Sequence, residues 1–193
     1  MDAAAIQQAY LQAIYTGHLD GSKLDVEELC AFQDMDSARL KIESAARCRN
    51  LRTVLHDDMR ILKRVQSKEC MLSHVNAYCA SPDFWHHRGR TLIEDFCLFL
   101  SKRIDDDPLA ATLARIEGVY SGLSVKPTER TPWAAHSIDI SDEVVTERFS
   151  SAFVIDWTQF SKCPSSYAPI ERQTICCVRR TPDKVSIRFV EEG

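Results

Sequence analysis

The spacing of apolar residues changes once along this chain, near Leu123, and that change limits the folds it can adopt. Before this point apolar side chains recur every three or four residues, the spacing of amphipathic helices. Beyond a segment with two prolines, apolar and polar residues alternate, as in half-buried β-strands. The pattern predicts an α+β protein, with an N-terminal helical bundle and a small C-terminal antiparallel β-domain that ends in a hairpin.

Capping residues and helix breakers locate the helices of the first part. Gly17 and Pro82 each follow a helical pattern, and Asp107 with Pro108 supplies an N-cap acid and a proline at the first helical position. Helices are expected near residues 6–16, 25–32, 37–65, 69–80, 92–100 and 108–123.

Alternation predicts strands at residues 149–157, 175–179 and 185–190, the last two joined by a turn at 181–184. The expected domains are a helical domain at 1–123, a linker at 124–137 and a β-rich peptide-recognition domain at 138–193. A small sheet has exposed edges, and an extended peptide can bind such an edge as an added strand.

Composition argues against several classes of protein. The net charge of −4 gives no global attraction to nucleic acid, and no apolar run reaches the roughly 18 residues that span a membrane. The N-terminal sequence lacks the pattern of a secretory signal, so we expect a cytoplasmic protein. Without a C-x-x-C motif, the eight cysteines are expected to be buried free thiols.

Motifs for catalysis or metal binding are missing from the sequence. It has no G-x-S-x-G, no glycine-rich phosphate loop and no H-E-x-x-H. Cys70 and His74 would share a helical face, but Cys79 drifts from it and a fourth zinc ligand is missing. The three acids before Pro108 are explained by helix capping. We therefore expect that this chain is not an enzyme and that it carries no cofactor.

Two surface features leave alternatives open. The segment from Arg39 to Lys68 contains nine Lys or Arg residues and three acidic residues. On a helical projection several basic side chains of this segment fall in one line, which we call the basic stripe. This stripe is either a solvated helix flank or a site for an acidic partner or nucleic acid. The aromatic segment 82–87 either folds inward or contacts a partner. The members of the stripe are Arg49, Arg52, His56, Arg60 and Lys63.

Three segments carry a resemblance to a known family: AARCRNLRTVLHDDMRILKRV, SHVNAYCASPDFWHHRGRTLIEDFCLFL and LARIEGVYSGL, at residues 45–65, 73–100 and 113–123. The closing CCVRRTPDKVSIRFVEEG is similar to the strand pair that ends many members. Together they resemble the partner proteins of multinuclear non-haem iron-dependent oxidative enzymes that modify ribosomally made peptides.

The resemblance implies a non-catalytic subunit of a heterodimer, in which the partner enzyme holds the iron. The subunit would bind a small precursor peptide and present its cysteine-containing end to that iron. The chain looks most like the partners of the 3-thiaglutamate pathway, whose complex excises the β-carbon of a C-terminal cysteine. Partners in methanobactin synthesis, where oxazolone and thioamide groups form, are the nearest alternative.

The sequence and the resemblance together indicate two sets of candidate residues. For peptide contact we predict Val154, Asp156, Ile175, Cys177 and Arg179. For the interface with the enzyme we predict Phe84, Trp85, His86, Arg49 and Arg52. Two rival hypotheses remain: a nucleic-acid-binding regulator that uses the basic stripe at 39–68, and an enzyme that uses scattered cysteines or histidines.

Overall fold

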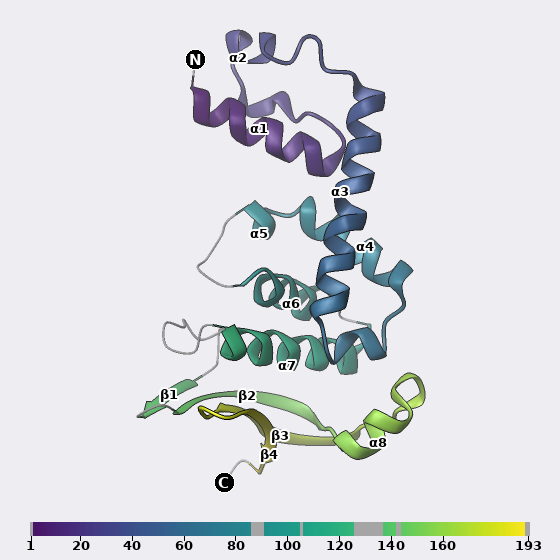
Figure 1. The fold of residues 1–193 in the computed structure, drawn as a ribbon, viewed down its shortest axis with the longest axis vertical. Helices are drawn as coiled ribbons and strands as arrows, with labels where there is room; N and C mark the ends of the chain where they lie inside the picture. Colours follow the sequence, from purple (N-terminus) through teal and green to yellow (C-terminus); the bar gives the residue numbers. More distant parts are fainter. Residues whose placement is uncertain (1, 86–90, 105, 126–136, 142–143, 192–193) are drawn as a thin grey trace. The chain divides into compact units, whose positions relative to one another are not determined.

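The described residues form two compact units, the first helical and the second a combination of helices and a sheet (Figure 1). The first unit comprises residues 1–56 and 68–86, and the second comprises residues 57–67 and 87–193. The predicted α+β class is therefore confirmed, as is the terminal hairpin. The residues that the computed structural model describes are 2–85, 91–104, 106–125, 137–141 and 144–191.

Capping residues set the helix ends of the first unit. Asp2 accepts a hydrogen bond from the backbone N–H of Ala4, and Gly17 ends the first helix with a φ of 78°, a conformation that favours glycine. Asp25 and Glu28 form a capping box at the second helix. The elements are α1 (Ala3–Thr16), η1 (Gly21–Lys23), α2 (Val26–Cys30), α3 (Ser37–Asp58), α4 (Lys68–Cys79) and α5 (Pro82–Trp85).

The second unit is built on two long helices and four strands. Asp107 accepts a hydrogen bond from the backbone N–H of Ala110 at 2.9 Å, and Pro108 opens the longer helix as predicted. The elements of the second unit are η2 (Leu62–Arg64), α6 (Leu92–Arg103), α7 (Pro108–Val125), β1 (Ser137–Ser141), β2 (Val144–Val154), α8 (Trp157–Lys162), η3 (Pro164–Ser166), β3 (Ile170–Arg180) and β4 (Val185–Val190).

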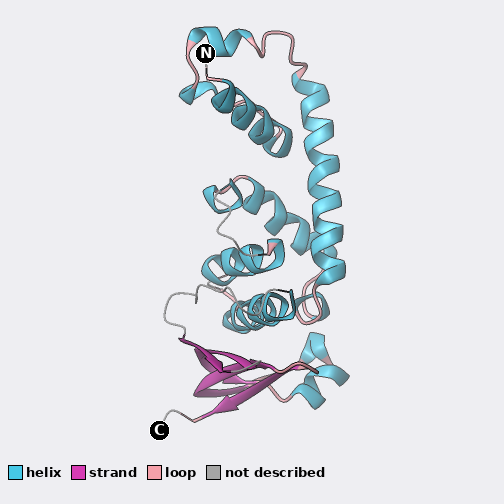
Figure 2. Ribbon diagram, turned by 60° about the vertical axis from the view of Figure 1, so that its left-hand side comes forward, coloured by secondary structure: helices cyan, strands magenta, loops and turns pink. Residues whose placement is uncertain are grey.

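The four strands form one antiparallel sheet in the order β1-β2-β3-β4, and α7 covers one of its faces (Figures 1 and 2). Phe149, Cys176 and Val178 are buried on that face. Arg180 donates to the carbonyl oxygens of Leu123 and Ser124, at 2.6 and 2.9 Å, where the helix leaves carbonyls without intrahelical partners. The opposite face of the sheet is called the open face below.

The helix predicted at 37–65 ends early, because α3 stops at Asp58. The backbone N–H groups of residues 60–62 donate to the carboxylate of Glu117 on α7 instead of to helical carbonyls. Arg60 and Lys63 therefore lie outside α3, so the basic stripe predicted on a single helix was wrong.

The strand predicted at 149–157 also ends early. β2 stops at Val154, and the carboxylate of Asp156 accepts from the N–H groups of Thr158 and Gln159, which makes it the N-cap of α8. Trp157 is thus the first residue of a helix that the alternation pattern did not predict. Strand β1 was also not predicted, and it begins within the expected linker.

The compact units divide the chain differently from the predicted domains at 1–123 and 138–193, because α7 packs on the sheet and α6 packs on α7. A small sheet buries little apolar surface by itself, so it forms its core together with helices that follow the first unit in sequence. Peptide recognition by residues 138–193 stays a prediction.

All eight cysteines are free thiols, and their burial is mixed. Cys48, Cys79, Cys97 and Cys176 are buried, Cys177 is half-buried, and the other three are exposed. Among the described residues, no helix combines the length and apolar character that crossing a membrane requires.

Candidate functional site

The open face of the sheet gathers three of the residues predicted to contact peptide. Ile175, Cys177 and Arg179 alternate along β3 with the buried Cys176 and Val178, so they share the open side. β3 lies between β2 and β4 along this stretch, and its backbone groups are used by those neighbours. These residues can therefore meet a ligand through their side chains, while the outer edge of the hairpin belongs to β4.

Arginines surround Cys177 on this open face. The strand register places Arg148 of β2 and Arg188 of β4 on either side of it, and Arg179 follows two residues along β3. Strands lie roughly 4.8 Å apart, so these three guanidinium groups fall within reach of one short extended segment. Arg179 and Arg188 are exposed, which makes this part of the face suitable for carboxylate groups.

The other two predicted peptide contacts lie at the end of β2. Val154 is half-buried and on the open side of that strand. Asp156 accepts from the N–H groups of Thr158 and Gln159 at 2.9 and 3.1 Å, and its own N–H donates to the hydroxyl of Tyr167 at 2.7 Å. The carboxylate of Asp156 therefore has a structural role in starting α8.

The aromatic residues predicted for the enzyme interface pack against other rings of the first unit. Phe84 meets Tyr15, Tyr78 and Trp85 edge to face, with ring centroids 5.0, 5.2 and 4.7 Å apart. Trp85 donates its indole N–H to the carbonyl oxygen of Cys79 at 3.1 Å. Both side chains remain half-buried. We call these four rings the aromatic cluster.

The remaining interface candidates are less constrained. His86 lies outside the described residues. Arg49 and Arg52 lie on α3, where Arg49 donates to the carbonyl oxygen of Ala45 at 3.1 Å. Their role at an interface stays a prediction.

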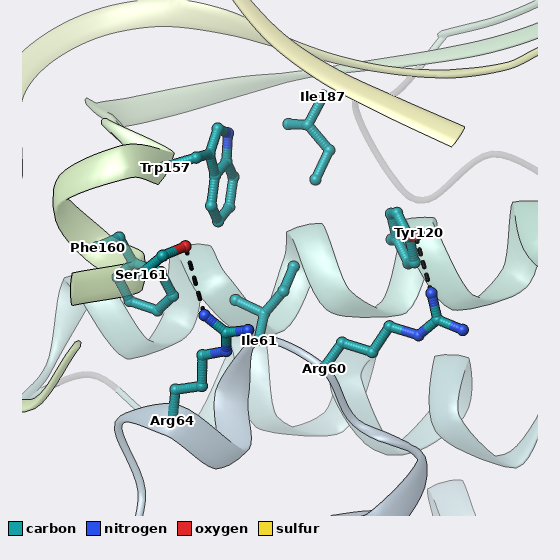
Figure 3. A pocket seen from close by; sticks show the side chains of 8 residues that line it. All are labelled: Arg60, Ile61, Arg64, Tyr120, Trp157, Phe160, Ser161 and Ile187. Atoms are coloured by element: carbon teal, nitrogen blue, oxygen red, sulfur yellow. Dashed lines mark hydrogen bonds between the residues drawn. The ribbon is translucent and has the colours of Figure 1, made fainter. Parts of the chain in front are cut away.

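A cavity of about 200 Å³ in the second unit was not predicted from the sequence (Figure 3). Its walls are mostly apolar and aromatic: Trp157 and Phe160 come from α8, Tyr120 from α7, and Ile187 from β4. The indole nitrogen of Trp157 is buried and has no hydrogen-bond partner among the described residues. We call this cavity the arginine pocket, after the two side chains described next.

Two arginines complete the wall of the arginine pocket (Figure 3). Arg60 donates to the hydroxyl of Tyr120 at 3.1 Å and lies over its ring, 5.6 Å from the centroid. Arg64 donates to the hydroxyl of Ser161 at 3.4 Å, the long limit for such a bond. Among the described residues, neither guanidinium lies within 4.0 Å of a carboxylate.

Buried Glu117 fixes the segment that carries these arginines. Its side chain is 0% exposed and accepts from the backbone N–H groups of Arg60 and Leu62, each at 2.9 Å, and from that of Ile61. Burial raises the pKa of the Glu117 carboxyl above its ordinary value, against the opposing effect of these hydrogen bonds. A side chain on α7 thereby positions residues 60–62 at the pocket.

Cys70 and His74 lie together on α4, as their spacing predicted, with the sulfur and the Nε2 atom 3.5 Å apart. Among the described residues, no group of three or more His, Cys, Asp or Glu side chains could hold a metal ion. Whether the chain binds a metal stays a prediction.

Two buried thiols bear on the hypothesis of a cysteine enzyme. A hydrogen bond from the Cys79 thiol lowers the pKa of Cys48 to about 7, and the same contact with burial raises the pKa of Cys79. A thiolate at Cys48 would be nucleophilic, but its side chain is only 3% exposed and donates toward the carbonyl oxygen of Tyr15. A substrate could not reach it without rearrangement of the first unit.

Comparison with known proteins assigns the chain to no family. No protein-family model matches the chain. No curated protein matches its sequence at a significant level.

Proposed function

We propose that this chain is a non-catalytic subunit that binds a ribosomally made precursor peptide in the cytoplasm and presents the peptide's cysteine-containing end to a separate multinuclear iron enzyme. The observation that supports peptide binding is the open face of the sheet, where Cys177 lies among Arg148, Arg179 and Arg188. The proposal of an iron enzyme as the partner rests on the family resemblance of residues 45–65, 73–100 and 113–123. So does its reaction, excision of the β-carbon of a C-terminal cysteine.

The outer edge of β4 suits an extended ligand. Among the described residues this strand pairs only with β3, so the N–H and C=O groups on its other side can pair with an added strand. Side chains of such a strand would alternate between the two faces, and those on the open side would lie next to Ser186, Arg188 and Val190. Acidic residues at these positions would meet Arg188 directly, while Arg179 lies one strand further away on β3.

A pull-down of the tagged chain from its native cell lysate, with mass spectrometry and metal analysis of the eluate, tests this proposal. We expect a short peptide and a near-stoichiometric iron-containing protein with the full chain, and no stoichiometric iron on the chain purified alone. The double variant Arg179→Glu, Arg188→Glu should lose the peptide and keep the iron protein, because it reverses charge only on the open face.

The double variant Arg39→Glu, Lys41→Glu is the matched control, because it makes the same charge change at exposed positions of α3 in the first unit. It should retain both partners. If the unmodified chain recovers nucleic acid and this control variant does not, the result would instead support the regulator hypothesis. Stoichiometric metal on the isolated chain would support an enzyme. Retention of the peptide by the open-face variant would overturn the proposed binding surface.

A further inference from the structure

We propose that the arginine pocket is a binding site for a carboxylate joined to a flat or branched apolar group, about the size of one aromatic ring. This inference does not rest on the proposed function, because the pocket lies on the face of the sheet that α7 covers and uses other residues. Three observations carry it: the size and lining of the cavity, the charge of its rim, and the ordered packing of its walls.

The size and lining suit one ring. An apolar protein cavity of about 150 Å³ holds benzene, so a cavity of about 200 Å³ has room for a ring with a small polar substituent. Trp157, Phe160 and Ile187 supply the apolar contacts that such a ring requires (Figure 3). Ligand sites in proteins share this design, in which mostly apolar walls surround a few convergent polar groups.

The charge of the rim selects an anion. A guanidinium has five N–H groups, and Arg60 and Arg64 each use one in a hydrogen bond to a hydroxyl. Carboxylates are the anions that arginine binds in a planar, bidentate geometry. Arg64 is the primary candidate, because its 3.4 Å bond to Ser161 is weak and easily exchanged for a charged acceptor. Arg60 is held by its two contacts with Tyr120 and supplies the second charge.

The walls of the pocket are held in place by contacts within the chain. Glu117 fixes residues 60–62, and the ring of Phe160 packs between Trp157 and Tyr167 at centroid distances of 5.8 and 5.4 Å. The walls are therefore already ordered for a ligand.

Calorimetric titration of the full chain with 3-phenylpropionate and with its neutral amide tests the site. We expect saturable binding of the acid at about millimolar affinity, the range for a ligand of this size, and at least about tenfold weaker binding of the amide. Arg64→Gln should weaken binding of the acid about tenfold or more and leave the amide unchanged.

Arg39→Gln, at an exposed position of the first unit, is the control that should bind the acid like the unmodified chain. Circular dichroism confirms that each variant is folded before it is titrated. The proposal is overturned by the absence of saturable binding at tens of millimolar acid. It is also overturned if the amide binds as tightly as the acid, or if Arg64→Gln and Arg39→Gln behave alike.

The carboxylate could belong to a free small molecule or to the C-terminal residue of a peptide. Titration with Gly-Gly-Phe and with its C-terminal amide distinguishes these sources. If the tripeptide acid binds tighter than 3-phenylpropionate and the tripeptide amide does not, the site receives a peptide terminus. Binding of 3-phenylpropionate with exclusion of the tripeptide assigns it to a small molecule.

Discussion

Trp85 in the first unit and Trp157 in the second are both half-buried and both lie among aromatic rings, but their surroundings differ. Trp85 donates its indole N–H to the carbonyl oxygen of Cys79, and its ring packs against Tyr15 and Phe84. The indole nitrogen of Trp157 has no partner among the described residues, and its ring lines a cavity. Aromatic residues alone therefore do not indicate a site in this chain.

Arginines of the two units extend the comparison. Arg47 in the first unit forms an ion pair with Glu43 at 2.8 Å, whereas the described residues offer no carboxylate to Arg60 or Arg64 in the pocket. Arg60 and Arg64 are exposed, so each guanidinium stays solvated and available to an anionic ligand. This difference points to the second unit, and each prediction below alters one side of it.

The largest expected effect comes from Glu117→Ala. This substitution leaves the three backbone N–H groups of residues 60–62 without their acceptor, and each unpaired buried group costs about 1–3 kcal/mol. We expect the free energy of unfolding to fall by about 3 kcal/mol or more in urea denaturation. Glu191→Ala is the control, since its ion pair with Arg172 is exposed and should matter by less than about 1 kcal/mol. A similar loss in both variants would contradict the positioning role of Glu117.

Replacing each tryptophan with phenylalanine compares the two indole nitrogens directly. Trp85→Phe removes a hydrogen bond and should lower the free energy of unfolding by about 1 kcal/mol. Trp157→Phe removes a buried donor that has no partner among the described residues, so it should be neutral or slightly stabilising. Urea denaturation of the two variants, followed by far-UV circular dichroism, measures both values. A greater loss for Trp157→Phe would mean that its nitrogen has a partner in solution.

The sequence predicted the local structure of both units better than it predicted either site. The turn at 181–184, the N-cap at Asp107 and the C-cap at Gly17 depend on neighbouring residues, and all three are present. The early end of α3 depends on Glu117, more than fifty positions away, so no local pattern could indicate it. The start of α8 was within reach, because Asp156 followed three residues later by Gln159 is a recognisable helix N-terminus.

The candidate sites divide in the same way. Alternation along β3 was enough to place Ile175, Cys177 and Arg179 on one face. It could not show that β4 covers the edge of β3, or that Arg148 and Arg188 flank Cys177, because strand register is a tertiary property. The arginine pocket joins a turn, two helices and a strand, and only the basic composition of residues 39–68 hinted at its charge.

A pH titration of stability isolates the buried carboxyl of the second unit. Burial raises the pKa of Glu117 in the folded chain above its ordinary value of 4.5, so folding favours its protonated form. Its contribution to stability is fully present below the unfolded pKa and is lost as pH rises through the folded pKa. We expect the unfolding free energy of the unmodified chain to decline over that window relative to that of Glu117→Gln, measured at matched pH values. The opposite slope would show that the three backbone hydrogen bonds outweigh burial.

The smallest expected effect separates a paired arginine from an unpaired one. Arg47→Gln removes an i,i+4 ion pair on α3 and should lower the free energy of unfolding by about 0.3–0.5 kcal/mol. Arg64→Gln removes a charge that no described carboxylate neutralises, together with one long hydrogen bond to Ser161, so we expect a change below about 0.3 kcal/mol. Replicate thermal and urea denaturation at low ionic strength can resolve this difference, because added salt should reduce the effect of Arg47→Gln first. If Arg64→Gln costs more than Arg47→Gln, the guanidinium of Arg64 stabilises the fold and is not available to a ligand.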